Sequence, residues 1–198
     1  QIKPGGFFIQ KSGLTLSSKE TGYTFGINQG DYQATNIRIE NHRMVFDMLY
    51  PGGKITDIPM RIPGFHNIEN ALAASALAMH HGVGPDEIKA GIASFKGVKR
   101  RFEYHVETED HVMIDDYAHH PTEISACLTS VKALYPDEKI VAVFQPHLFS
   151  RTRDFLDDFG KSLAIADEIY LLDIYPAREL PIPGIDSHLL LKKIHSKE

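Results

Sequence analysis

The sequence predicts an α/β protein in two parts: antiparallel strands with helices, followed by a parallel-sheet part. Short β-rich segments, separated by Gly, Pro and Asn, occupy residues 7–62. Two helical patterns follow as far as about residue 95. From about residue 100, strand and helix patterns alternate, which implies a parallel sheet with right-handed crossovers. We therefore expect two domains, 1–99 and 100–198.

The first part contains an antiparallel hairpin. Apolar side chains alternate with polar ones at Ile37 and Ile39, and again at Met44, Phe46 and Met48, on either side of a polar turn. This alternation is typical of a pair of strands with one buried face. The candidate strands of the first part are residues 7–9, 23–27, 35–39, 44–49 and 55–62.

Two helices complete the first part. An Ala-rich pattern predicts a helix over 68–81 that Gly82 ends, and Pro85 opens a second helix to about residue 95. Asn67 and Asn70 lie one turn apart at the start of the first helix, so their side chains can face the same way. Asn67 alone could simply cap the helix, whereas the pair could meet the edge of a purine. The spacing does not decide between the two.

The second part begins after a predicted linker at 97–101, where a strand-like stretch starts at Phe102. Ser187 is a candidate cap for the last helix. The expected strands are residues 112–114, 140–144 and 168–174, and the expected helices are 121–135, 151–166 and 187–194.

Polar side chains follow each strand of the second part. Residues 115–123 place two acids, a Tyr and two His before a helix, in which Pro121 suits the first position and Glu123 suits a capping box. Parallel strands end at one edge, and ligands bind there in open α/β sheets. We therefore expect one site, although Asp115 or His120 alone could merely cap the helix. The other two polar groups are residues 145–147 with Arg151, and Asp173 with Tyr175 and Arg178.

Composition excludes several classes of function. A net charge of −5 in 198 residues leaves no basic footprint for nucleic acid. The lone Cys127 cannot form an internal disulfide, which favours a reducing compartment, and no neighbour in sequence activates it as a nucleophile. The longest apolar run, 71–79, is far shorter than a membrane span, and no signal-peptide pattern is present. The opening at Gln1 suggests a piece of a longer protein.

Three classes of protein could carry such a site. A metal hydrolase is disfavoured, because H-E-x-x-H is missing and Arg151 and Arg178 would put positive charge beside the cation. A phosphate-handling enzyme fits the carboxylates and Arg, although Ile55 after Gly53-Lys54 rules out a P-loop there. A non-catalytic, nucleotide-regulated binding module has the same residues and stays open.

In combination, several motifs resemble the Mur ligases of peptidoglycan synthesis. The likeness covers nearly the whole chain from Gly64 onward and is specific as a set. The motifs, in order, are GFHNIENALAA at 64–74, RRFE at 100–103, DDYAHHPTE at 115–123, FQPH at 144–147, RTRD at 151–154 and DIYPARE at 173–179.

This resemblance implies an ATP-dependent ligase that forms an amide bond through an acyl phosphate. Residues 1–99 would be the later part of a central ATPase domain, and 100–198 most of a Rossmann-like C-terminal domain that binds the amino acid. ATP and Mg2+ are the implied cofactors, with the P-loop and the main metal ligands outside this chain, so no residue here is assigned to a metal. The chain alone is expected to be inactive and its location cytoplasmic.

The resemblance also implies roles for single residues. Asn67 and Asn70 would lie beside adenine, Arg101 would reach the nucleotide, and Asp116 would hold the ribose hydroxyls. Tyr117 and His119 would line the phosphate side of the cleft. His147 and Arg151 would place the amino acid, whose carboxylate suits an Arg. His119, His147 and Arg151 are the candidate catalytic residues, acting by positioning and charge stabilisation.

Within the family, the likeness is nearest to members that add L-alanine to UDP-N-acetylmuramate. Pro146-His147 followed by Arg151-Thr152-Arg153 favours this substrate pair. Members that attach whole peptides to the muramate share the DDxAHHPT pattern and are the nearest alternative. One departure is Leu148, where many members carry Arg, so Arg151 would bear more of the amino-acid carboxylate.

Overall fold

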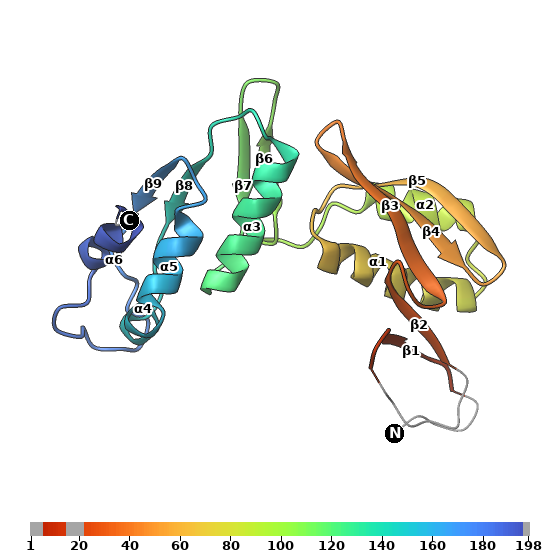
Figure 1. Cartoon of the computed structure of the whole chain (residues 1–198), viewed down its shortest axis with the longest axis horizontal. Helices are drawn as coiled ribbons and strands as arrows, with labels where there is room; N and C mark the ends of the chain where they lie inside the picture. Colours follow the sequence, from red (N-terminus) through yellow and green to blue (C-terminus); the bar gives the residue numbers. More distant parts are fainter. Residues whose placement is uncertain (1–5, 15–21, 196–198) are drawn as a thin grey trace. The chain divides into compact units, whose positions relative to one another are not determined.

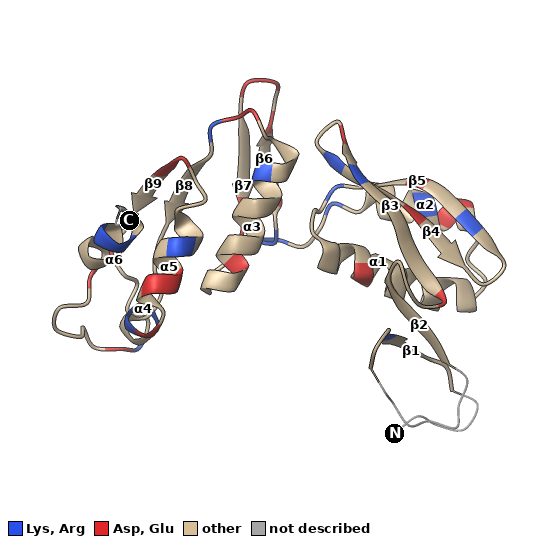
Figure 2. Cartoon of the chain, in the orientation of Figure 1, with Lys and Arg blue, Asp and Glu red and all other residues tan. Residues whose placement is uncertain are grey.

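The computed structural model describes residues 6–14 and 22–195. The chain divides into two compact units, Gln1–Val98 and Lys99–Glu198 (Figure 1). Lys and Arg are interspersed with Asp and Glu in each unit (Figure 2). Within the described ranges, no helix combines the length and the apolar character that crossing a membrane requires.

The first unit is built on one five-stranded sheet with the order β1-β2-β3-β4-β5. The expected antiparallel pairing holds for β3 to β5, whereas β1, β2 and β3 pair in parallel. The short connection from β2 to β3 is fixed by Asp31, whose carboxylate accepts hydrogen bonds from the amide and the hydroxyl of Thr24, both at 2.8 Å. The strands are β1 (Phe8–Lys11), β2 (Gly22–Ile27), β3 (Tyr32–Glu40), β4 (Arg43–Tyr50) and β5 (Gly53–Met60).

The predicted hairpin is β3 and β4, but its single buried face is not observed. Met44, Phe46 and Met48 are buried as expected, yet Asp47 on the opposite face of β4 is buried too. Ile39 is 42% exposed, because it lies at the end of β3 beyond a shift in register. β4 is a central strand that pairs with both β3 and β5. Asn36 of β3 and Lys54 and Asp57 of β5 contact the Asp47 carboxylate and cover it from water.

Two helices pack in this unit, α1 (Phe65–His80) and α2 (Pro85–Ser94). The start of α1 precedes the predicted residue 68, because Gly64 with φ 108° turns the chain into the helix three residues earlier. Ile68 and Leu72 are fully buried in the core. The predicted opening of α2 at Pro85 is confirmed.

The second unit contains two short sheets. The predicted parallel pairing is confirmed for β8 and β9, whereas β7 forms an antiparallel pair with β6. A tight turn at 108–111 brings β7 back beside β6, so β7 pairs with its neighbour in sequence and not with a distant parallel strand. The elements are β6 (Glu103–Glu107), β7 (Val112–Asp115), α3 (Pro121–Leu134), β8 (Val141–Phe144), α4 (Phe149–Asp154), α5 (Leu156–Leu163), β9 (Glu168–Leu171) and α6 (Ser187–His195).

The core of this unit lies between the β8–β9 pair and helices α3, α5 and α6. Phe159 and Leu190 are fully buried in it. The single helix predicted over 151–166 is divided at Phe155, whose φ of −117° interrupts the helical backbone between α4 and α5. Asp186, not Ser187, caps α6, because its Oδ1 accepts the amide of Leu189 at 2.7 Å.

Candidate functional site

The carboxyl ends of β8 and β9 lie side by side, because the two strands run parallel. Beyond the strands, the amide of Tyr175 donates to the carbonyl of Pro146 at 2.8 Å, and the amide of Leu148 donates to the carbonyl of Tyr175 at 3.0 Å. The rings of His147 and Tyr175 stack with their centroids 5.4 Å apart. Two of the three polar segments expected at one edge therefore lie together.

The turn from His147 into α4 has an unusual backbone. Leu148 has φ 75° and ψ 131°, a conformation that costs a residue other than Gly about 1–3 kcal/mol. Its carbonyl accepts hydrogen bonds from the amide and the hydroxyl of the buried Thr152, at 3.1 and 2.9 Å. Such strain persists only where neighbouring contacts enforce it, and it concentrates at functional sites.

Arg151 lies in the first turn of α4, close in sequence to His147. Its side chain is half-buried, and its Nη1 atom is buried without a hydrogen-bond partner among the residues that the structure describes. A buried donor left unpaired costs about 1–3 kcal/mol, and more when it is charged. A carboxylate or phosphate oxygen would satisfy it, because the guanidinium presents its donors in a planar fork.

The polar turn before α3 is closed by its own side chains. His120 is the N-cap, and its Nδ1 accepts the amide of Thr122 at 3.4 Å. Oε2 of Glu123 accepts the amides of His119 and His120 at 3.0 and 3.2 Å. Burial disfavours ionisation of Glu123, but these amides and the His119 ring outweigh it and lower the pKa of its carboxyl. The predicted capping box is confirmed, and His120 has the structural role.

Asp116 joins this turn to the beginning of the unit. Its Oδ1 accepts the amide of Ala118 and its Oδ2 accepts the amide of Phe102, each at 2.8 Å. Every carboxylate oxygen has a second lone pair, so both can also accept a hydrogen bond from a ligand hydroxyl. Asp116 therefore has a structural role, and the ribose contact that the motif implies stays a prediction.

The side chains of three other predicted residues, Arg101, Tyr117 and His119, lie close to one another. The guanidinium carbon of Arg101 lies 6.0 Å from the ring centroid of Tyr117, and the rings of Tyr117 and His119 are 5.1 Å apart. Tyr117 is 51% exposed. A cation, an exposed aromatic ring and an imidazole are suited to stacking on a base and meeting phosphate oxygens.

A ring contact connects the start of α3 with α4. The His120 ring lies edge-on to that of Phe155, with the centroids 4.7 Å apart, and Phe155 marks the break between α4 and α5. All three polar segments predicted for the second part lie in one unit. They do not end at one sheet edge as expected, because β7 pairs with β6 in a sheet separate from that of β8 and β9.

Asn67 and Asn70 belong to the first unit, in the first two turns of α1. Asn67 does not cap the helix, since Gly64 is the N-cap and the side-chain amide of Asn67 donates to the carbonyl of Pro63 at 2.7 Å. Asn70 is exposed. Their role beside adenine stays a prediction.

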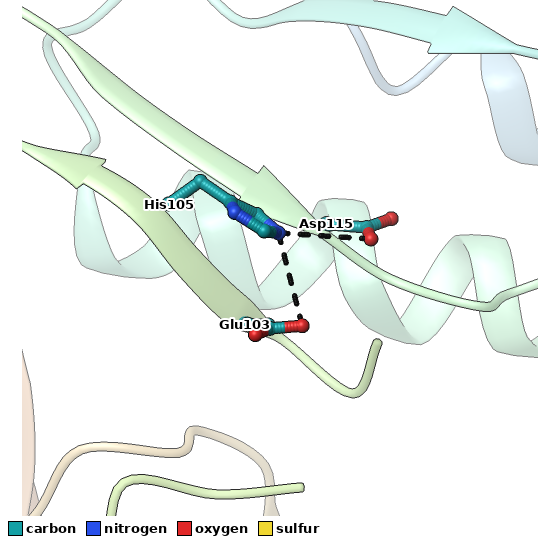
Figure 3. Close-up of side chains that lie close together, drawn as sticks. All are labelled: Glu103, His105 and Asp115. Atoms are coloured by element: carbon teal, nitrogen blue, oxygen red, sulfur yellow. Dashed lines mark ion pairs between the residues drawn. The ribbon is translucent and has the colours of Figure 1, made fainter. Parts of the chain in front are cut away.

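One further group of ionisable side chains lies on the β6–β7 pair (Figure 3). His105 Nε2 is 3.7 Å from both Glu103 Oε2 and Asp115 Oδ2, which face each other across the strands. Nε of Arg100 lies 4.0 Å from Asp115, and its amide donates to Glu103 at 2.8 Å. Mg2+ prefers octahedral oxygen ligands, so an imidazole and a nearby guanidinium make this set a poor fit.

Three features of this site could not be predicted from the sequence. The positive φ of Leu148 occurs at a residue that is neither Gly nor Asn, the types that usually adopt it. The helix break at Phe155 lies where the apolar residues keep helical spacing. Glu179, whose carboxylate accepts the amide of Ser150 at 2.9 Å, is 29 residues away in sequence. No local pattern could reveal that contact.

Comparison with known protein families gives two matches. Residues 100–198 match the Mur ligase glutamate ligase domain, and residues 11–78 match the Mur ligase middle domain. The chain belongs to the Mur ligase family. The two matched regions of this Mur ligase chain fall one in each of its compact units.

Relatives of this Mur ligase chain carry consistent names. It is 49% identical over 193 residues to a UDP-N-acetylmuramate–L-alanine ligase of Phocaeicola vulgatus, covering 96% of the chain and 42% of the relative. The same name belongs to a Flavobacterium psychrophilum protein, 55% identical over 177 residues, with 89% of the chain and 40% of the relative covered. The chain spans about two fifths of the length of these relatives.

A solved structure resembles the fold of this Mur ligase chain. The crystal structure of UDP-N-acetylmuramate-alanine ligase from Thermotoga maritima superposes with a TM-score of 0.66 and 32% identity. The match covers 77% of this chain and 34% of that one.

Proposed function

We propose that this chain is part of an ATP-dependent ligase that adds L-alanine to UDP-N-acetylmuramate in peptidoglycan synthesis. The γ-phosphoryl group of ATP would pass to the muramoyl carboxylate, giving an acyl phosphate and ADP. The amino group of L-alanine would then attack the carbonyl carbon, and inorganic phosphate would leave. The names of the relatives support the substrate pair.

The observation that carries this proposal is the buried Nη1 of Arg151, which has no hydrogen-bond partner among the described residues and lies in the helix turn that follows His147. An α-carboxylate from L-alanine would accept its hydrogen bond and balance its charge. With Leu148 contributing no charge of its own, Arg151 is the cation available in this turn. His147 would help to place the amino acid.

On the nucleotide side, Arg101 would reach the nucleotide, and Asn67 with Asn70 would lie beside adenine. Asp116 would accept hydrogen bonds from the ribose hydroxyls, and Tyr117 and His119 would line the phosphate side. No G-x-x-x-x-G-K-[ST] pattern occurs in these 198 residues, so the P-loop would lie outside them. The main Mg2+ ligands would also come from residues outside this chain. The chain alone should therefore not ligate L-alanine, and a cytoplasmic location fits the lone Cys127.

Steady-state kinetics of the full-length protein test the proposal. Arg151→Ala should raise KM for L-alanine on the order of 10- to 100-fold, as expected for a lost charged hydrogen bond, and leave KM for ATP nearly unchanged. Arg153→Ala is the matched control, because Arg153 lies on the same helix and pairs with Asp154 at 2.7 Å. Equal effects on both substrates would count against the assignment.

The same assay separates the alternatives. A ligase of the peptide-attaching type would consume ATP with a muramyl peptide substrate and not with free L-alanine. A non-catalytic binding module would release no phosphate with either substrate but would bind the nucleotide.

A further inference from the structure

Glu179 reaches from the segment after β9 to the beginning of α4. Its Oε2 accepts the amide of Ser150 at 2.9 Å, and its Oε1 accepts the Ser150 hydroxyl. The Ser150 hydroxyl and amide lower the pKa of Glu179, so the ionised carboxylate is the form that fits. The contact joins residues 29 positions apart.

α4 needs such help. It has only six residues, and its N-cap, Leu148, offers no side-chain acceptor. A helix this short does not persist by its own hydrogen bonds, and its first amides have no partner within the helix. Glu179 supplies from another segment the acceptor that a Ser, Thr, Asp or Asn cap would normally provide.

The same segment holds the chain at a second point. The Tyr175 backbone forms hydrogen bonds with the backbones of Pro146 and Leu148, and the Glu179 side chain accepts the amide of Ser150. The loop that carries Tyr175 and Glu179 thus forms hydrogen bonds on both sides of the strained Leu148. Enforcement of this kind is what an unfavourable φ requires. Arg151 follows Ser150 directly in the sequence.

We propose that Glu179 is a positioning residue, which caps α4 through Ser150 and thereby fixes the side chain of Arg151 for the amino-acid carboxylate. This rests on the proposed function, in which Arg151 binds L-alanine. In this role Glu179 acts through Ser150 and Arg151 and needs no contact with the reacting groups. Without the cap, the first turn of α4 would fray and Arg151 would lose its fixed direction.

The structural half of the proposal needs no activity measurement. It is tested by hydrogen exchange of peptides covering residues 149–154. Glu179→Ala should speed exchange of these amides about 10-fold, as expected for a lost charged cap, and Glu179→Gln should give a smaller change. Ser150→Ala is a milder variant that removes only the hydroxyl bond, should Glu179→Ala fold poorly. Glu138→Ala, an exposed carboxylate between α3 and β8, is the matched control. Unchanged exchange in both Glu179 variants overturns the proposal.

The functional half uses the full-length ligase. Glu179→Ala should raise KM for L-alanine about 10-fold with little change in KM for ATP, and Glu179→Gln should restore part of the loss. If exchange rises while KM for L-alanine stays constant, and Arg151→Ala still raises it, Glu179 has a structural role only and the proposal is wrong. If Arg151→Ala leaves KM for L-alanine unchanged, the proposed amino-acid site fails first, and the positioning role fails with it.

Discussion

Asp47 offers the sharpest test of how the first unit is held together. Its buried carboxylate accepts hydrogen bonds at two register shifts of the sheet, one on each neighbouring strand. Oδ1 accepts the amide of Asp57 at 2.9 Å, and Oδ2 accepts the side-chain amide of Asn36 at 3.3 Å and the ammonium of Lys54 at 2.9 Å. Asn36 and Asp57 both have positive φ and lie where the register shifts. One carboxylate thus stabilises two β-bulges.

Replacing this residue by Ala should cost about 3 kcal/mol of unfolding free energy. The orphaned amide of Asp57 accounts for about 1–3 kcal/mol and the bond from Asn36 for about 1. The pair with the half-exposed Lys54 adds less than about 1 kcal/mol. A total of about 3 kcal/mol corresponds to a loss of protection on the order of 100-fold.

Hydrogen exchange measured by mass spectrometry resolves this effect by unit. Peptides from β4 and β5 should lose protection in Asp47→Ala, with those from β8 as the internal reference. Asp86→Ala is the matched control, since Asp86 is exposed in the first turn of α2. A loss of less than about 5-fold in β4 and β5 would refute the reasoning, because even one orphaned amide should cost about that much.

The pH dependence gives a second check on the same carboxylate. Burial opposes ionisation of Asp47, but the Asp57 amide, Lys54 and Asn36 outweigh it and hold the pKa below its ordinary value. Its contribution to stability is therefore complete above the ordinary carboxyl range and is lost as pH falls through the lowered folded-state pKa. The gap in protection between the wild type and Asp47→Asn should narrow on going from neutral pH to about pH 3. A gap that stays constant would contradict the assigned cause.

Two further predictions concern the second unit. Phe159→Ala should lower the unfolding free energy by about 3–5 kcal/mol, because the ring is fully buried in the core, and Phe159→Leu should lower it clearly less. Hydrogen exchange of β8 peptides measures the effect. A loss of protection below about 10-fold in the Ala variant would contradict the prediction. Burial raises the pKa of Cys127 to about 12, so its reaction with a disulfide reagent at pH 8 should be on the order of 1,000-fold slower in the folded protein than in urea. Equal rates in the two states would show that the thiol is accessible and ionised.

Several features of the fold were predictable because a few neighbouring residues determine them. The Pro121 opening of α3 and its Glu123 capping box depend on contacts within four residues, and both are present. The pattern of Met44, Phe46 and Met48 indicated a strand with a buried side for the same reason. The residues Arg101, Asp116, Tyr117 and His119 were also singled out from the sequence, and their ring and backbone contacts bring them together.

The sequence by itself determined the α/β alternation, the helix starts at Pro85 and Pro121 and the motifs that mark the Mur ligase family. Tertiary structure alone decided that β7 pairs with β6, that Leu148 adopts a positive φ and that Glu179 caps α4. The physical reason is range. A helical period or a capping box forms within one or two turns, whereas a strand partner or a distant cap is selected by contacts that exist only once the whole unit has packed.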